Sequence, residues 1–234
     1  DHARRTAESG ISALITGPTG TGKEVLARYI HKIGVRSGKP FVDINCPAIP
    51  STMFESELFG HEAGAFTGAT HKKIGLMEVA DDGILFLDEI ASMPMDLQAK
   101  LLRAIEERSF RRLGGNALIN VDVQILAASN RNLKEMIANG TFREDLYYRL
   151  KVSDLDLPPL SARKQDIPDL VGYFLRKFTL RSGSQINDVA PRAMQIMMEY
   201  SWPGNIRELS NVMERAVIFC DDPTIDLNHL PADV

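Results

Sequence analysis

The chain has few cysteines and no long apolar run, and these absences exclude several classes of protein. Cys46 and Cys220 stand outside any C-x-x-C pair or Cys/His cluster, so we expect no zinc site and no disulfide framework. No stretch of about 20 uncharged apolar residues occurs, so we expect no membrane span. The first residues, Asp1 to Arg5, lack the apolar core of a signal peptide. A cytoplasmic protein with buried, reduced thiols fits these observations.

An excess of positive charge is also absent, because 27 Lys and Arg face 31 Asp and Glu, a net charge of −4. Proteins that grip DNA over a broad surface are usually basic, so we do not expect this segment to be the main DNA-binding element. Some basic residues are candidates for contact with promoter DNA or a partner, although a solvated basic face is the ordinary interpretation. These residues are Lys72, Lys73, Arg111 and Arg112.

Apolar strands alternate with helical patterns over the first two thirds of the chain. We expect strands at 11–16, 41–45, 84–88, 121–129 and 151–157, and helices at 24–32 and 95–107. This alternation predicts an α/β fold with a parallel five-stranded sheet flanked by helices. The proline pair Pro158-Pro159 interrupts the pattern, and beyond it we expect only helices, at 167–178, 191–200 and 205–219. The expected domains are therefore 1–158 and an all-helical 159–234.

A glycine-rich loop joins the first expected strand to the first expected helix. Its residues are Gly17, Pro18, Thr19, Gly20, Thr21, Gly22, Lys23 and Glu24. The spacing fits G-x-x-x-x-G-K, in which backbone N–H groups curl around phosphate oxygens at a helix N-terminus. We expect Lys23 to reach the β- and γ-phosphates of ATP. Glu24 stands where Ser or Thr usually holds Mg²⁺, and a plain glycine-rich turn is the alternative interpretation.

Acids and amides follow three of the expected strands. Asp88 and Glu89 end the apolar strand 84–88, and the carboxyl ends of parallel strands face the ligand crevice. We expect Asp88 near Mg²⁺ and Glu89 as the general base that polarises the attacking water. Asn45 and Asn130 end two other strands and are candidates for positioning that water or contacting the γ-phosphate. Each asparagine alone is more often a turn-capping residue.

One segment carries a resemblance to a known family. Gly64, Ala65, Phe66, Thr67, Gly68 and Ala69 resemble the GAFTGA loop of sigma-54-dependent activators, the bacterial enhancer-binding proteins. Other motifs follow in the family's order over nearly the whole chain: GPTGTGKE, ELFGHEAGAFTGA, GILFLDEI, LLRAIEE, GTFREDLYYRL, LPPL and WPGNIREL. The resemblance implies a AAA+ P-loop NTPase with a C-terminal helical lid. It also implies Mg²⁺-dependent ATP hydrolysis that remodels the closed complex of sigma-54 RNA polymerase and opens promoter DNA.

The resemblance assigns roles to the loop and to three arginines. It implies that Phe66 and Thr67 contact sigma-54 at a mobile tip, whereas a core position is the ordinary expectation for a phenylalanine. It implies that Arg143 and Arg149 reach the γ-phosphate of a neighbouring subunit in a hexameric ring. A surface ion pair with Glu144 or Asp145 is the alternative for either arginine.

The end of the chain resembles the family's second sensor. Arg207 matches the arginine that contacts phosphate as the lid closes, and we expect Asn205 to cap the helix that follows it. The family usually carries Glu after the P-loop Lys, so Glu24 fits this interpretation.

Two other functions remain open, and further domains are expected. Another P-loop motor, such as a helicase loader, would lack the 64–69 loop. A nucleotide-gated binding module without turnover would not need Lys23, Asp88 and Glu89 together. Because the chain does not begin with Met, we expect a fragment, with regulatory and helix-turn-helix domains of the family lying outside it.

Overall fold

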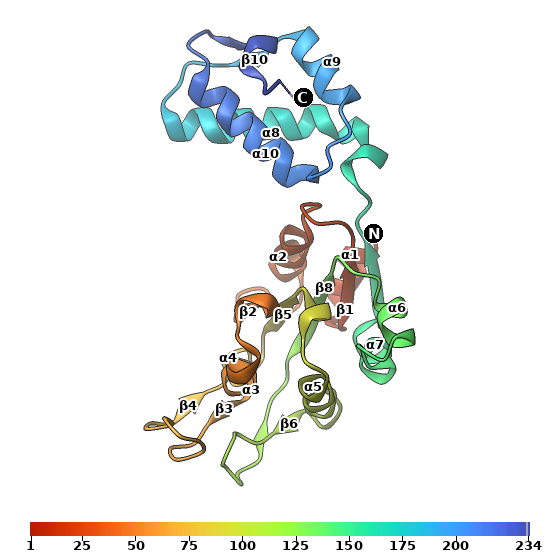
Figure 1. The fold of residues 1–234 in the computed structure, drawn as a ribbon, viewed down its shortest axis with the longest axis vertical. Helices are drawn as coiled ribbons and strands as arrows, with labels where there is room; N and C mark the ends of the chain where they lie inside the picture. The colour runs from red at the N-terminus through yellow and green to blue at the C-terminus, as the bar shows by residue number, and fades with distance from the viewer. Residues whose placement is uncertain (233) are drawn as a thin grey trace. The chain divides into compact units, whose positions relative to one another are not determined.

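The computed structural model describes residues 1–232 and 234, which form two compact units (Figure 1). The α/β unit comprises residues 1–16 and 23–156, and the helical unit comprises residues 17–22 and 157–234. The glycine-rich loop therefore groups with the helical unit, although both of its flanking segments belong to the α/β unit. Among the described residues, no helix combines the length and the apolar composition that crossing a membrane requires.

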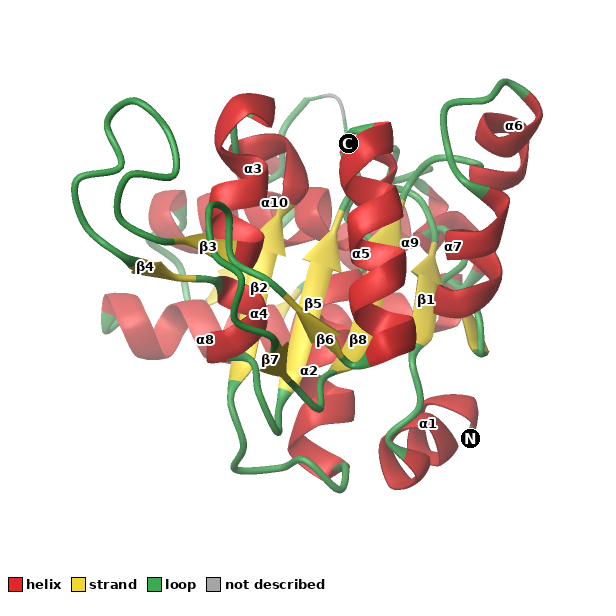
Figure 2. Ribbon diagram, turned by 90° about the horizontal axis from the view of Figure 1, so that it is seen from below, coloured by secondary structure: helices red, strands yellow, loops and turns green. Residues whose placement is uncertain are grey.

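A five-stranded parallel sheet forms the centre of the α/β unit, as the sequence predicted (Figure 2). The strands are β1 (Ala13–Thr16), β2 (Phe41–Asn45), β5 (Ile84–Asp88), β8 (Gln124–Ser129) and β9 (Ser153–Asp156). Their order is β2-β5-β8-β1-β9. β8 is buried at every position because it lies in the middle of the sheet and helices flank both faces. Asn45 pairs with Asp88, and Thr16 with Ser129, so the strand ends lie along one edge.

Helices flank this sheet, and in the longest of them, α5, the apolar face follows the 3.6-residue period. They are α1 (His2–Ser9), α2 (Lys23–Ile33), α3 (Ser51–Phe59), α4 (Leu76–Val79), α5 (Met95–Glu107), α6 (Leu133–Ala138) and α7 (Glu144–Leu150). In α5 the buried Leu97, Leu101 and Ala104 join Leu85 and Ile125 of the strands in one core. Short 3-10 turns follow β2 and β5, at Cys46–Ala48 and Ile90–Ser92.

Two short hairpins project from the unit, and the sequence did not predict them. β3 (Gly60–His61) pairs antiparallel with β4 (Lys73–Ile74), and β6 (Ser109–Phe110) with β7 (Ile119–Asn120). Strands of two residues are too short to show an alternating pattern, which explains why they were missed. Residues 64–69 lie at the end of the first hairpin, and a bridge from His61 to Leu113 joins the two hairpins.

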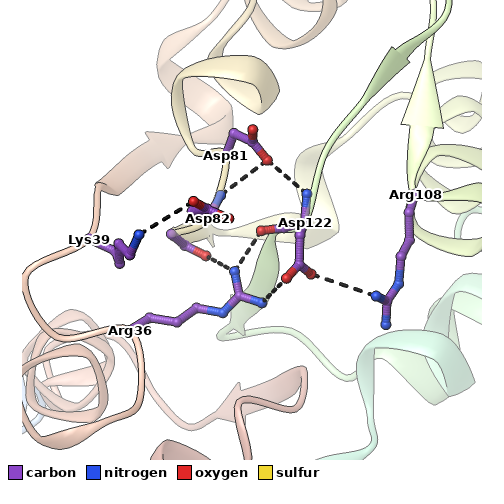
Figure 3. A network of polar contacts seen from close by, with 7 residues as sticks. Arg36, Lys39, Asp81, Asp82, Arg108 and Asp122 are labelled. Atoms are coloured by element: carbon purple, nitrogen blue, oxygen red, sulfur yellow. Dashed lines mark hydrogen bonds and ion pairs between the residues drawn. The ribbon is translucent and has the colours of Figure 1, made fainter.

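A polar network fixes the amino ends of the central strands (Figure 3). Arg36 donates to the carbonyls of Gly83 (3.1 Å) and Asp122 (2.6 Å), and it pairs with the Asp122 carboxylate at 3.0 Å. Asp81 accepts the N–H groups of Asp82 (3.1 Å) and Asp122 (2.8 Å). Gly83 and Asp122 precede β5 and β8 closely, so the network holds the loops that enter both strands in register.

The helical unit has its own core. Its helices are α8 (Ile167–Ser182), α9 (Pro191–Glu199) and α10 (Asn205–Phe219), with 3-10 turns at Leu160–Ala162, Lys164–Asp166 and Leu227–His229. α8 and α10 lie side by side and bury Trp202, whose indole N–H donates to the Met197 carbonyl at 2.7 Å. One expectation was incomplete, because β10 (Asp188–Val189) and β11 (Thr224–Ile225) form a short parallel pair within this unit.

Candidate functional site: a phosphate loop, an acidic strand end and a projecting hairpin

The phosphate loop has the backbone conformation that its glycines permit. Gly17, Gly20 and Gly22 have φ values of +146°, +81° and +97°. A Cβ on Gly17 would lie 2.4 Å from the Leu157 carbonyl oxygen, and one on Gly20 would lie 2.2 Å from that of Gly204. Other residues would therefore meet both backbone strain and a clash at these positions.

Side chains and backbone of the helical unit hold three consecutive carbonyls of the loop. The Thr19 oxygen accepts from Asn205 Nδ2 (2.9 Å), that of Gly20 from the Arg207 N–H (3.2 Å), and that of Thr21 from Arg163 Nη2 (3.0 Å). In a trans peptide the next N–H points opposite to the carbonyl. The N–H groups of residues 20–22 are therefore directed away from these donors, as a phosphate cradle requires.

Asn205 has another role than the sequence predicted, and a second residue of the helical unit, Arg163, was not predicted at all. Asn205 does not cap α10, because Gly204 occupies the N-cap position and its N–H donates to Glu208 Oε2 at 2.8 Å. Instead the buried Asn205 side chain accepts the N–H of Leu160 at 2.8 Å and donates to the loop. Arg163 was missed, since nothing in the sequence distinguishes it from other arginines. Arg207 lies in the first turn of α10, as predicted.

The first turn of α2 places two predicted residues at the end of the phosphate loop. Lys23 begins the helix and is only 8% exposed. The Glu24 carboxylate accepts from Arg28 Nε at 2.8 Å, and Arg28 also pairs with Asp43 of β2 at 2.7 Å. Glu24 therefore takes part in a surface ion-pair chain that ties α2 to the edge strand of the sheet.

The acidic strand end combines three of the predicted side chains along one edge. Asp88 ends β5 beside Asn45 of β2, and Asn130 follows β8 on the other side. Glu89 has a left-handed backbone conformation (φ +51°), and its N–H donates to Asp88 Oδ1 at 3.0 Å. A glutamate costs about 1–2 kcal/mol in this region, and such strain is concentrated at functional sites.

A buried thiol lies beneath this edge. Burial, followed by the charges of Asp88 and then Glu89, raises the pKa of Cys46 to about 12. Cys46 is therefore a neutral, unreactive thiol at physiological pH, in agreement with the expected buried and reduced state.

The donor set at the strand end fits Mg²⁺ bound together with a nucleotide. Mg²⁺ is usually held by one or two carboxylates and the substrate phosphates, rather than by an all-protein cage. Asp88 and Glu89 supply adjacent, half-exposed carboxylates, and the described residues contain no cluster of three or more metal-ligating side chains. The residues therefore suit a metal that arrives with phosphates.

The hairpin loop exposes its phenylalanine. Phe66 is 46% exposed, so it does not fold into the core as an isolated phenylalanine would be expected to do. Gly64 and Gly68 on either side have φ values of +84° and +101°. The Gly64 N–H donates to the Ala69 carbonyl at 2.7 Å, and the Ala69 N–H to that of Phe66 at 3.0 Å. Thr67 lies at the exposed tip of this turn.

An arginine of the second hairpin holds the base of this loop. The Arg112 side chain is 9% exposed, and it pairs with Glu62 at 2.9 Å and with Glu78 at 2.6 Å. Arg112 is thus not part of a solvated basic face, and Lys73 also forms an ion pair, with Glu57. Gly114 approaches Ala65 so closely that an added Cβ would lie 2.7 Å from the Ala65 Cβ. The two hairpins therefore pack as one element.

The two predicted trans-acting arginines lie at opposite ends of α7. Arg143 is its N-cap and makes a two-point ion pair with Asp145, at 3.0 and 2.7 Å. This pairing holds the pKa of Asp145 below its usual range. Arg149 is exposed in the last turn and lines a pocket with Ser12 and Gln124, which lie at the amino edge of the sheet. The structure therefore does not bring Arg149 to Asp88 of its own chain.

The sheet order, the glycine-rich loop and the helical unit define a AAA+ P-loop fold. A family model described as the sigma-54 interaction domain matches residues 1–156, and one described as the AAA+ ATPase lid domain matches residues 161–234. The chain belongs to the family of sigma-54-dependent transcriptional activators.

Curated relatives and solved structures agree with this family. The chain is 52% identical over 230 residues to the regulatory protein AtoC of Escherichia coli K12, covering 98% of this chain and 50% of AtoC. It is 49% identical over 224 residues to the transcriptional regulatory protein FlbD of Caulobacter vibrioides, and the match covers 96% of this chain and 49% of FlbD. Crystal structures of Brucella abortus NtrX with ADP and with ATP have TM-scores of 0.90 and 0.91 at 41% identity. The matched regions cover 99% and 100% of this chain, respectively, and 52% of each NtrX chain. The chain thus spans about half the length of these relatives.

Proposed function

We propose that this chain hydrolyses ATP and uses the hydrolysis to remodel the sigma-54 RNA polymerase closed complex, which opens promoter DNA. The observation that carries the proposal is the exposed Phe66 on a glycine-flanked loop, in a chain that also has a phosphate loop and an acidic strand end. Among P-loop proteins this combination favours an activator over a helicase loader. Since NtrX was crystallised with ADP and ATP, the same nucleotides are proposed here.

In this proposal the chain's own residues bind the phosphates of ATP and orient and activate the attacking water. The N–H groups of residues 20–22 and the side chain of Lys23 hold the β- and γ-phosphates, and Gly17, Pro18, Thr19 and Glu24 complete the loop around them. When bound, Mg²⁺ held by Asp88 neutralises charge on these phosphates. Glu89 accepts a proton from the attacking water, while Asn45 and Asn130 orient that water from the neighbouring strand ends. Arg207 contacts phosphate from the helical unit.

A neighbouring copy of the chain supplies the arginines that neutralise negative charge on the γ-phosphate. Arg149 lies at the amino edge of the sheet and Asp88 at the carboxyl edge, so a single copy does not join them. A head-to-tail ring, hexameric in this family, would bring Arg143 and Arg149 of one copy to the γ-phosphate of the next. Arg143 would exchange its pairing with Asp145 for the phosphate. Regulatory and DNA-binding domains are proposed to lie in the remaining half of a full-length protein.

Sigma-54 binding in defined nucleotide states tests the proposal. The chain is mixed with sigma-54 under three conditions: without nucleotide, with ADP, and with ADP plus a mimic of the γ-phosphate transition state. Binding to sigma-54 is expected only with the mimic. In a separate assay with ATP, the chain is expected to release phosphate.

Thr67→Ala should retain ATP turnover within about twofold but lose promoter opening, since the hydroxyl lies at the loop tip and not at the phosphate loop. Equal loss of both activities would refute this division of labour.

A further inference from the structure

The phenylalanine at the loop tip rests against a histidine at the base of the same hairpin. The ring centroids of Phe66 and His61 lie 5.0 Å apart, and the ring planes meet at 68° in an edge-to-face arrangement. Aromatic pairs favour this geometry because the positive ring edge meets the negative ring face. His61 belongs to β3, so the contact links the exposed tip to a paired strand.

A buried serine fixes the orientation of this histidine. Ser56 Oγ and His61 Nδ1 are hydrogen-bonded at 2.7 Å, and Ser56 is buried in α3. The imidazole is therefore held on one side by the core, and its other side contacts the Phe66 ring. Through these two contacts, the position of Phe66 depends on a side chain anchored in the core of the α/β unit.

The backbone of the loop alone does not specify where the ring points. The hydrogen bonds at Gly64 and Ala69 close the turn but leave the Phe66 side-chain torsions free. An added Cβ on Gly64 or Gly68 would find no atom within 4 Å, so neither glycine is packed against the rest of the unit. The contact with His61 supplies a restraint on the ring that the backbone does not.

We propose that His61 is a positioning residue that holds the Phe66 ring in the orientation in which sigma-54 binds it. The inference rests on the proposed function of the loop. Phe66 remains 46% exposed while it contacts His61, so the contact orients the ring without covering it. A ring that is ordered before binding loses less conformational entropy when the complex forms, and binding is correspondingly tighter.

Affinity for sigma-54 in the presence of ADP and the transition-state mimic tests this role. An edge-to-face pair shifts an equilibrium roughly 2- to 12-fold, so His61→Ala should weaken binding by that factor. His61→Phe keeps an aromatic ring and should restore most of the affinity. Ser56→Ala leaves the imidazole but frees its orientation, and should cause a smaller loss in the same direction.

His71→Ala is the matched control, because His71 is an exposed histidine in the same hairpin loop. It should leave the affinity unchanged, and thermal melting of each variant establishes that it is folded. A gain of affinity in His61→Ala would show that the histidine hinders binding of the Phe66 ring to sigma-54, and would overturn the proposal. Equal losses in the His61 and His71 variants would also overturn it.

A measurement without sigma-54 separates failure of this inference from failure of the proposed function. The intact chain carries 4-fluorophenylalanine at position 66, and its ¹⁹F resonance is recorded. His61→Ala should move the resonance because the imidazole ring current is removed, whereas His71→Ala should not. An unmoved resonance refutes the contact itself. A moved resonance without any sigma-54 binding refutes the proposed function and leaves the contact standing.

Discussion

At the scale of single residues, the backbone of Glu89 shows how the site departs from ordinary stability rules. Its left-handed conformation (φ +51°) suits glycine, yet the position carries a carboxylate beside Asp88. The strain is compatible with folding because the flanking strand and the buried Ile90 over-determine the backbone. The carboxylate at the strand end therefore lowers the free energy of unfolding relative to a glycine at this position.

Glu89→Gly should be more stable than Glu89→Ala by about 1 kcal/mol, because only glycine adopts positive φ without a Cβ clash. Neither variant should hydrolyse ATP, since both lack the proposed base. Urea denaturation and phosphate release measure the two properties separately. A glycine variant that is no more stable than the alanine variant would mean that this backbone is unstrained.

Cys46 makes stability depend on pH in the alkaline range. Its pKa is raised from 9.0 to about 12 in the folded chain, so the folded state favours the protonated thiol. That stabilisation is complete below pH 9 and is lost as the pH rises from 9 towards 12. The unfolding free energy should therefore fall more steeply than in Cys46→Ala, and the extra slope should approach about 1.4 kcal/mol per pH unit above about pH 10, where the unfolded thiol is ionised. Denaturation of both chains between pH 8 and 10.5 measures the slopes, and parallel slopes would contradict the assignment.

At the scale of elements, the hairpins β3–β4 and β6–β7 depend on one buried cation. Arg112→Ala would leave Glu62 and Glu78 without their shared partner, which should destabilise the chain by about 1–3 kcal/mol. Amide exchange in residues 62–69 should accelerate, because the base of the loop is released.

The neighbouring Arg111 provides the control for this change. Its side chain is exposed and donates to the Asn116 carbonyl within its own hairpin, at 2.8 Å. Arg111→Ala should leave exchange in residues 62–69 unaltered. If both variants accelerate exchange equally, the ion pairs of Arg112 do not specifically hold the loop.

At the scale of the whole molecule, the proposed ring makes catalysis a property of neighbouring copies. A Lys23→Ala chain and an Arg149→Ala chain should each be inactive. In a random equal mixture, about a quarter of the sites join an intact Lys23 to an intact partner arginine, so about a quarter of the activity should return. Phosphate release at several mixing ratios measures this recovery. Activity that never exceeds the sum of the separate chains would exclude action between copies.

Much of the fold could be predicted from the sequence because its signals are local. The five strands of the central sheet, the helices α2, α5, α8, α9 and α10 and the glycine-rich loop each follow from spacing within a short segment. Two-residue strands carry no such signal, so the hairpins and the β10–β11 pair were missed. The assignment of Asn205 as a cap was wrong because Gly204 and Glu208 close the helix end instead.

Local sequence patterns already indicate the available chemistry: a loop that accepts phosphates, acids at the end of an apolar strand, and a small-residue loop with one large aromatic side chain. The contacts that hold these groups in place could be identified only in the folded chain. Arg163, Asn205 and Arg207 orient the loop carbonyls, Arg112 joins two hairpins, and His61 meets Phe66. These contacts could not be predicted because periodicity and turn preferences act over a few residues, whereas the contacts join segments that are far apart in the sequence and meet only on folding.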